Sequence, residues 1–410
     1  MFIKLAIKSL LYRKTSVLFT LLAMSMSVFI MVGVEHIRLQ AKTSFTNSIS
    51  GVDLIVGART SNINLLLYSV FRVGEPTNNV SLSSYQALLD DTNIRWAVPI
   101  ALGDSHKGFR VMGTTNQYFE YFSFANKQYL SLKKGTEFKE LFDVVIGSQV
   151  ANKLGYVVGD KVVLSHGIGV TSFTHHDHLP FRVSGILSAT GTPVDQTVHV
   201  SLQGLHAVHL PKAKIKSVLD RKGSSLTMLD DFIPQSITSV FLGLKSRIAV
   251  FQIQRKINSN PNEPLSAILP GVALSQLWQT MSIFDNVLRL ISLLVFISSL
   301  LGLTAMLCSS IKERSHEIKL LRMIGAPAGF IFWFIELEAL LIAFLGSLVA
   351  CSALSFMLLY GQSYLIDHYG VVISANILQS MSLVVSGLFV LLVFSAALAP
   401  ALIAYKEAKT

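Results

Sequence analysis

The side chains best suited to chemistry in this chain are its histidines, which gather in one region. Of eleven histidines, seven lie between positions 166 and 209: His166, His175, His176, His178, His199, His206 and His209. The densest part places three imidazoles and one carboxylate side by side, at His175, His176, Asp177 and His178. Because both groups are ligands of zinc and copper, this stretch is a candidate zinc site. A solvated loop rich in histidine, or a patch whose charge follows pH, would give the same pattern.

Several charged residues lie inside or beside apolar stretches. Glu336 and Glu338 fall within one, where a charge is costly and usually faces a helix bundle or water. A role in helix packing or coupling, and a position near the inner membrane surface, explain these two acids equally well. Arg289, near the outer end of another stretch, is expected to extend to lipid headgroups. Asp53 and Arg59 flank a short apolar strand and are expected to form local ion pairs.

Motifs for nucleotide binding and hydrolysis are absent from the sequence. It contains no Gly-x-x-x-x-Gly-Lys-Ser/Thr phosphate loop, no Gly-x-Ser-x-Gly and no His-Glu-x-x-His. We therefore expect a chain that is not an enzyme and that has no nucleotide site or cofactor of its own, apart from the candidate zinc.

The composition is that of a membrane protein. The 410 residues are 51% hydrophobic and 14% charged, with a mean hydropathy of +0.54, which is too apolar for an ordinary soluble domain. The net charge of +10 has no nucleic-acid recognition motif beside it and is better explained by basic loops next to apolar spans. Both cysteines, Cys308 and Cys351, lie in apolar runs, so we expect no disulfide in an exported domain.

Four stretches are long and apolar enough to cross a bilayer, which takes about 20 residues. They are expected at residues 16–38, 286–308, 328–360 and 382–405. The first is predicted to be retained rather than cleaved, because Val34, Glu35 and His36 offer no small-residue cleavage site.

The distribution of basic residues sets the orientation. Lys and Arg are frequent before the first span and in the segment 309–327, whereas the segment 361–381 contains neither. The positive-inside rule therefore places both termini, an amphipathic entry helix at 1–15 and a tail at 406–410 in the cytoplasm. Residues 39–285, and the short loop 361–381, are then outside.

The exported segment alternates short β-like runs with helical patterns. Apolar runs bounded by glycine or proline predict strands, while residues 83–90 and 148–154 predict helices, the second capped by Ser148. A further helical part is expected around residues 203–230. The predicted fold is thus membrane α-helical, with four transmembrane helices and an α+β extracytoplasmic domain of two lobes inserted between the first and the second.

Several of these stretches match a known family in sequence and in order. Residues 143–164 read as a strand, a short helix and a Gly-Asp turn, and residues 181–195 read as the next strand and turn. With one helix before the domain and three after it, the chain resembles the FtsX/MacB-type permeases of ABC transporters, also described as MacB/LolC/LolE-like or type VII. It differs from fused members such as MacB because it carries no ATPase.

The segment 309–327 is similar to the family's coupling segment, a short amphipathic helix that docks on the ATPase. The resemblance implies coupling roles for the following residues: Glu313, Arg314, Glu317, Ile318, Leu321, Arg322 and Gly325. A loop helix lying on the membrane surface is the alternative.

The resemblance also implies a function. It predicts the permease subunit of an ABC transporter in the bacterial inner membrane, with its large domain in the periplasm. ATP and magnesium would be bound by a separate ATPase, and the other partners would be a second copy of the chain, membrane lipid and a periplasmic or outer-membrane protein. The alternatives are metal-linked transport through the histidine-rich loop, and a signalling scaffold that activates a periplasmic partner.

Overall fold

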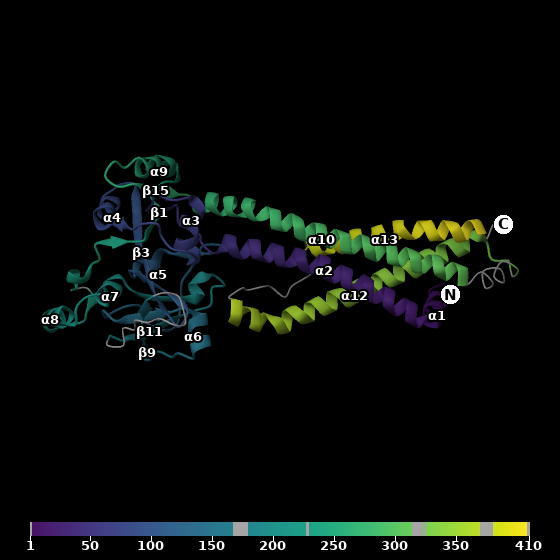
Figure 1. Ribbon diagram of the computed structural model, residues 1–410, viewed down its shortest axis with the longest axis horizontal. Helices are drawn as coiled ribbons and strands as arrows, with labels where there is room; N and C mark the ends of the chain where they lie inside the picture. Colours follow the sequence, from purple (N-terminus) through teal and green to yellow (C-terminus); the bar gives the residue numbers. More distant parts are fainter. Residues whose placement is uncertain are drawn as a thin grey trace. The chain divides into compact units, whose positions relative to one another are not determined.

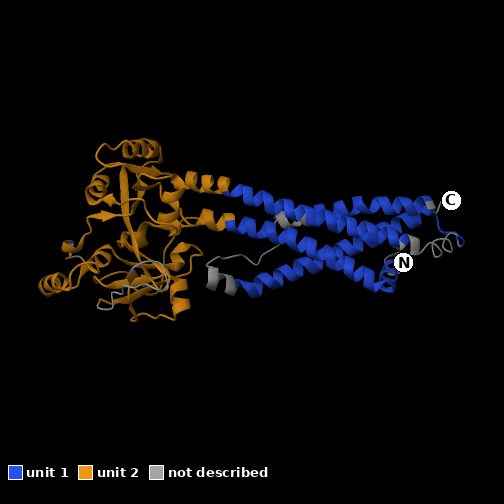
Figure 2. Cartoon of the chain, in the orientation of Figure 1, with its two compact units in different colours: residues 1–41, 281–363, 373–410 blue, residues 42–280, 364–372 orange. Residues whose placement is uncertain are grey.

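The computed structural model describes residues 2–166, 179–226, 229–313, 323, 325–369 and 380–407. Figure 1 shows the helices and strands along the chain. The chain divides into two compact units, coloured separately in Figure 2. The helical unit contains residues 1–41, 281–363 and 373–410, and the sheet unit contains residues 42–280 and 364–372.

The helical unit is built from long helices: α1 (Phe2–Tyr12), α2 (Lys14–Asn47), α10 (Pro270–Glu313), α12 (Ala328–Tyr369) and α13 (Ser380–Glu407). In the part of the chain that the structure describes, α2, α10, α12 and α13 are long and apolar enough to cross a membrane, which confirms the four predicted transmembrane helices. Hydroxyls in these helices bond to their own backbone, as Thr304 Oγ1 does to the Leu300 carbonyl at 2.8 Å. Such bonds satisfy polar groups that lipid cannot.

All four membrane-spanning helices are longer than the predicted spans, α13 by only two residues at each end. Helix α2 runs on to Asn47, and α10 begins at Pro270. Helix α12 continues to Tyr369, so residues 361–369 are helical where the sequence predicted a loop. A helix satisfies its backbone groups internally, so it need not end where the apolar run ends. The division between the two units falls within α2, α10 and α12, which each contribute residues to both.

Small residues let α2 and α12 approach closely within the helical unit. A Cβ atom built on Gly346 would lie 3.3 Å from the Cβ of Met24, and one built on Gly33 would lie 3.6 Å from Leu354. Close backbone approach at small residues is the usual basis of helix packing in membranes.

The sheet unit contains one mixed sheet with eleven strands among the described residues. Its main path runs in the order β15 (Leu265–Ile268), β1 (Leu54–Ala58), β14 (Ser239–Leu244), β3 (Ile94–His106), β4 (Phe109–Thr114), β12 (Thr197–Ser201), β8 (Asp143–Ile146), β11 (Phe181–Leu187) and β7 (Leu132–Gly135). Off this path, β10 (Ser165–His166) pairs with β3, and β9 (Lys161–Val162) pairs with β11. The β4–β12 and β8–β11 pairs are parallel, and the other pairs are antiparallel. Two small pairs lie apart: β2 (Val80–Ser81) with β13 (Ser236–Ile237), and β5 (Ser123–Phe124) with β6 (Gln128–Tyr129).

The long strand β3 joins the two halves of the sheet. Its first part pairs with β14, and its second part pairs with β4 after a register shift between Leu102 and Ser105. Each half has its own buried cluster, one around Leu54 and Leu242 and one around Val144. The two lobes expected from the sequence are therefore two halves of one continuous sheet.

Short helices and turns cover the sheet. They are α3 (Asn62–Leu66), the π-helix η1 (Leu67–Phe71), α4 (Leu82–Leu89), α5 (Gln117–Tyr121), α6 (Ser148–Leu154), the 3-10 turn η2 (Pro193–Gln196), α7 (Leu202–Ala207), α8 (Lys212–Lys222), the 3-10 turns η4 (Asp230–Phe232) and η5 (Arg247–Ala249), and α9 (Val250–Asn258). Helices α4 and α6 confirm the two predicted helices, and α7 and α8 supply the helical part expected around residues 203–230.

The predicted cap of α6 is wrong. Its N-cap is Gly147, with no side-chain hydrogen bond, and Ser148 is the first helical residue. A Cβ atom on Gly147 would lie 2.3 Å from the Asp195 carbonyl oxygen, so close backbone packing requires glycine there.

The packing of α2 against α12 can be tested with Gly346→Leu. We expect this substitution to lower the free energy of unfolding by about 1–3 kcal/mol, because the larger side chain must displace Met24. Unfolding in detergent micelles would measure the effect. The matched control is Gly387→Leu, where an added Cβ meets nothing within 4 Å. Equal effects of the two substitutions would contradict close packing at Gly346.

Candidate functional site

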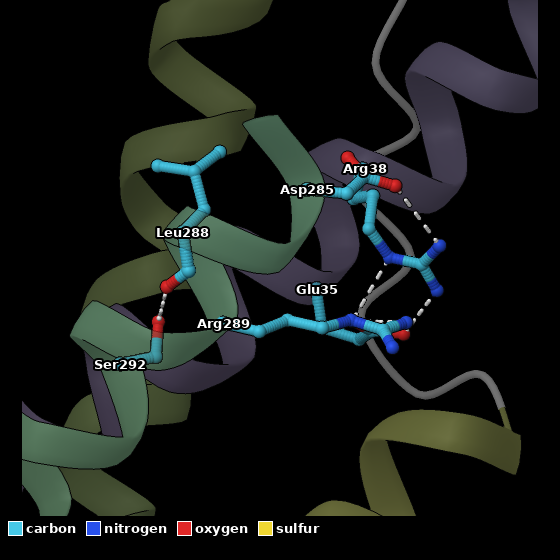
Figure 3. A network of polar contacts seen from close by, with 6 residues as sticks. All are labelled: Glu35, Arg38, Asp285, Leu288, Arg289 and Ser292. Atoms are coloured by element: carbon cyan, nitrogen blue, oxygen red, sulfur yellow. Dashed lines mark hydrogen bonds and ion pairs between the residues drawn. The ribbon is translucent and has the colours of Figure 1, made fainter. Parts of the chain in front are cut away.

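A network of charged side chains joins α2 to α10 within the helical unit (Figure 3). Arg38 is at its centre, with Nη2 2.6 Å from Glu35 Oε1 and Nη1 3.6 Å from Asp285 Oδ2. Arg289 Nη2 lies 3.8 Å from Glu35 Oε2. Glu35 and Arg38 are 17% and 16% exposed, so the charges are only partly screened by solvent. The network therefore links two long helices through their charged side chains.

Arg289 has a carboxylate partner in the structure, and its extension to lipid headgroups stays a prediction. Its side chain is 53% exposed, but its guanidinium group pairs with Glu35 on α2. The Glu35 carboxylate gives the Arg289 guanidinium group a charged partner within the protein, in the way that a phosphate of a lipid headgroup would at the membrane surface.

Within the sheet unit, aromatic side chains hold the ends of α2 and α10. The ring of Phe45 on α2 lies 4.9 Å from that of Phe71 in η1 and 5.8 Å from that of Trp278 on α10. Asn62 Nδ2 on α3 donates to Gln276 Oε1 on α10 at 3.1 Å. Helix α2 therefore packs against η1, and α10 is bonded to α3.

The two acids on α12 are both buried. Glu338 accepts a hydrogen bond from the Ser9 hydroxyl, which ties α1 to α12. Glu336 is fully buried, and neither of its carboxylate oxygens has a hydrogen-bond partner among the described residues. An unpartnered buried carboxyl group is expensive, so Glu336 lowers the stability of the helical unit unless it gains a partner.

Most of the predicted coupling residues lie outside the described residues: Arg314, Glu317, Ile318, Leu321 and Arg322. Glu313 is the last described residue of α10. Gly325 has a φ of +98°, a conformation that favours glycine, and it is followed closely by the start of α12. The coupling role of this segment stays a prediction.

The histidines do not form one group. His175, His176, Asp177 and His178 lie outside the described residues, and the described residues contain no group of three or more ligands placed to hold a metal. His199 is buried between aromatic rings, and burial lowers its pKa to about 3. The zinc site therefore stays a prediction.

Other histidines have ordinary structural partners. The backbone of His166 lies opposite that of Asp104 in the β10–β3 ladder. His209 Nε2 lies 3.6 Å from the buried Asp104 carboxylate, and its hydrogen bond with that group raises the pKa of His209. Burial lowers the pKa of the neighbouring His206.

Among the described residues, Asp53 and Arg59 bond to the backbone, and the ion pairs predicted for them are not seen. Asp53 Oδ2 accepts from the Leu244 amide at 2.7 Å, and Arg59 Nη2 donates to the Asn258 carbonyl at 3.0 Å. Both side chains fasten strand ends, where unpaired backbone groups need partners.

The α2–α10 network was missed from the sequence, although a signal was present. Glu35 and Arg38 are three positions apart, and Asp285 and Arg289 are four apart, so each pair shares one helix face. Each pair also lies at the outer end of a predicted span. Each pair contains one acid and one base, so ion pairs between the two helices could have been predicted.

The two buried acids on α12 are expected to respond differently to removal. Glu338→Leu should lower the free energy of unfolding by about 1–2 kcal/mol, because Ser9 loses its acceptor. Glu336→Leu should leave stability unchanged or higher, because it removes an unpartnered carboxyl group. Unfolding of both variants in detergent micelles would test this. A loss for Glu336→Leu as large as that for Glu338→Leu would mean that Glu336 has a partner in the folded protein.

Comparison with known proteins identifies the family. The family model for a MacB-like periplasmic core domain matches residues 17–259, and that for the FtsX-like permease C-terminal region matches residues 289–409. No curated protein sequence matches the chain.

Two solved structures are similar to part of the chain. The periplasmic region of MacB from Actinobacillus actinomycetemcomitans is 14% identical, over 57% of this chain and 94% of that one, with a TM-score of 0.33. The extracellular domain of the noncanonic ABC-type transporter YknZ from Gram-positive bacteria is 13% identical, over 52% of this chain and 98% of that one, with a TM-score of 0.30. These scores are too low to carry an argument, so the assignment rests on the family models. The first of these alone covers more than half of the chain, and the chain therefore belongs to the FtsX/MacB-type permeases of ABC transporters, with multiple membrane-spanning helices and a periplasmic-type domain.

Proposed function

We propose that this chain passes movement, driven by ATP hydrolysis on a separate ABC ATPase, to its sheet unit in order to export or extract a substrate. The family is one of ABC transporters, which work with an ATPase partner. The observation that carries the proposal is the pair of continuous helices α2 and α10, each of which contributes residues to both units.

The contacts of these helices support movement as a pair. An α-helix is held along its length by internal hydrogen bonds, so displacement at one end is passed to the other. Arg38 and Arg289 join α2 to α10 through carboxylates of the opposite helix. Phe45 of α2 then packs against both Phe71 of η1 and Trp278 of α10.

The predicted coupling segment follows α10 and precedes α12 in the chain. A push on this segment by an ATPase would therefore act on both helices at once. Helix α1 would follow α12, because Ser9 bonds to Glu338. In this proposal two copies of the chain pair in the bacterial inner membrane, with their sheet units in the periplasm.

Two other functions from the sequence analysis stay predictions. Metal-linked transport depends on His175, His176 and His178, which lie outside the described residues. A signalling scaffold would use the same helices to activate a periplasmic partner. Purification with a periplasmic hydrolase, and with no transported species, would favour the scaffold.

The ATPase partner can be tested by affinity purification of the full chain in mild detergent. We expect a separate ABC ATPase to be recovered with it, and Glu317→Ala/Arg322→Ala to reduce the recovered ATPase activity about tenfold or more, since charged contacts at an interface are costly to remove. The control, Asp220→Ala/Arg255→Ala, removes one acid and one base from exposed positions on α8 and α9. Reproducible absence of an ATPase from the wild-type preparation would overturn the proposal.

Transmission through the α2–α10 network can be tested separately. In the purified complex, ATP should change the hydrogen exchange of residues 42–280, and Arg38→Gln/Asp285→Asn should weaken this response because it removes an interhelix ion pair. We expect the coupling free energy between ATP binding and the exchange of residues 42–280 to fall by about 1 kcal/mol.

A second ion pair provides the matched control for this experiment. Lys222→Gln/Asp231→Asn removes a contact of 2.6 Å between α8 and η4, inside the sheet unit. Its response to ATP should equal that of the wild type. An undiminished response in the Arg38→Gln/Asp285→Asn complex would exclude the network from transmission.

A further inference from the structure

A large cavity in the sheet unit is not used by the proposed coupling. Its volume is about 810 Å³, within the range of small-molecule sites. It opens among the residues after η1, the turn between β3 and β4, helix α6 and the turn η2.

The charged residues that line this cavity are all basic. They are Arg72, Lys107, Arg110 and Lys153, and no acidic residue is among the described residues of its lining. Four positive charges around one concave surface create a strong local potential that attracts anions.

Arg72 is the most unusual of the four. It is 9% exposed, and its Nε and Nη1 atoms are buried without a hydrogen-bond partner among the described residues. Its Nη2 donates to the sulfur of Met112 at 2.7 Å, and no carboxylate is among its described partners. A guanidinium group stays charged in proteins, so this is a buried charge without a described counterion. An anion in the cavity would offset part of that cost.

The backbone at Arg72 is also unusual. Arg72 has a φ of +61°, in the left-handed region that arginine rarely adopts, and it directly follows the π-helix η1. Both features are uncommon, and both occur most often at functional sites. Both features occur at a residue that lines the cavity.

The other basic groups stand nearer to solvent. Arg110 donates to the Gly74 carbonyl at 3.0 Å, and its closest carboxylate, on the 73% exposed Glu75, is 3.8 Å away. The ammonium group of Lys107 lies 5.3 Å from the centre of the Tyr156 ring. Such long or exposed contacts leave these cations able to meet a ligand.

The remaining lining is largely apolar. It includes Phe71, Val73, Phe109, Leu154 and Pro193. A ligand that matches this lining therefore needs an apolar part as well as a negative charge.

We propose that this cavity binds a phosphate group carried on an apolar body. A phosphate monoester has close to two negative charges and three acceptor oxygens, which suits several cations better than a single carboxylate would. Phe71 lines the cavity and also packs against Phe45 of α2 at 4.9 Å, so the ligand lies one side chain away from a helix that the proposed coupling would move.

Calorimetric titration of the full chain in maltoside micelles with hexyl phosphate tests the proposal. This measurement needs no ATPase, so its result does not depend on the proposed coupling. We expect one site per chain, with inorganic phosphate weaker by about tenfold or more because it lacks the apolar part. Lys107→Gln/Arg110→Gln should weaken hexyl phosphate binding by about tenfold or more.

The control variant is Lys133→Gln/Lys134→Gln, which removes two exposed lysines of β7 outside the cavity. It should bind hexyl phosphate as the wild type does. Equal affinities for the two double variants, no binding to the wild type at about 10 mM, or equal affinity for inorganic phosphate would each overturn the proposal.

The source of the phosphate can be distinguished with the chain in phosphatidylcholine nanodiscs. If a bilayer lipid reaches the cavity, adding phosphatidic acid to the discs will lower the apparent affinity for hexyl phosphate, and the Lys107→Gln/Arg110→Gln chain will show no such competition. If affinity is unchanged, the ligand of the cavity is a soluble phosphate ester.

Discussion

The hydrocarbon core of a membrane offers no water, so every backbone polar group that crosses it must be bonded within the chain. This constraint explains the four long helices, and also the hydroxyls that return to their own backbone, as at Thr304. It also explains why charged side chains near the spans form ion pairs with one another. Arg38 lies between Glu35 and Asp285, and Arg289 joins them, so what satisfies these charges also ties α2 to α10.

The same two helices run continuously from the helical unit into the sheet unit. Because helical bonding does not stop where the apolar run stops, α2 and α10 continue into residues of the sheet unit. There Phe45 packs against both Trp278 and Phe71, and the β-strands begin soon after α2 ends. The proposed transfer of movement requires no hinge residue, only stiff helices and packed ends.

The sheet unit contains features that its stability alone does not require. A buried guanidinium group without a described counterion, a left-handed arginine and a π-helix meet at Arg72, and each of them costs free energy. The rest of the sheet is well paired, with apolar clusters on both halves that can support these costs. Such a concentration of unfavourable features beside a basic cavity is what a binding site needs, because the ligand supplies the missing contacts.

The sequence by itself determined the number of spans, the helices α4 and α6, the family and the likeness of segment 309–327 to a coupling segment. Apolar length, periodicity and short matched stretches are properties of neighbouring residues, so they can be read along the chain. The sequence could not show that α12 extends to Tyr369, or that Gly147 rather than Ser148 caps α6. Only the tertiary structure brought Arg38 to Asp285 and gathered Arg72, Lys107, Arg110 and Lys153 around one cavity. These residues come from separate elements, and their meeting depends on packing and strand order, which local patterns do not encode.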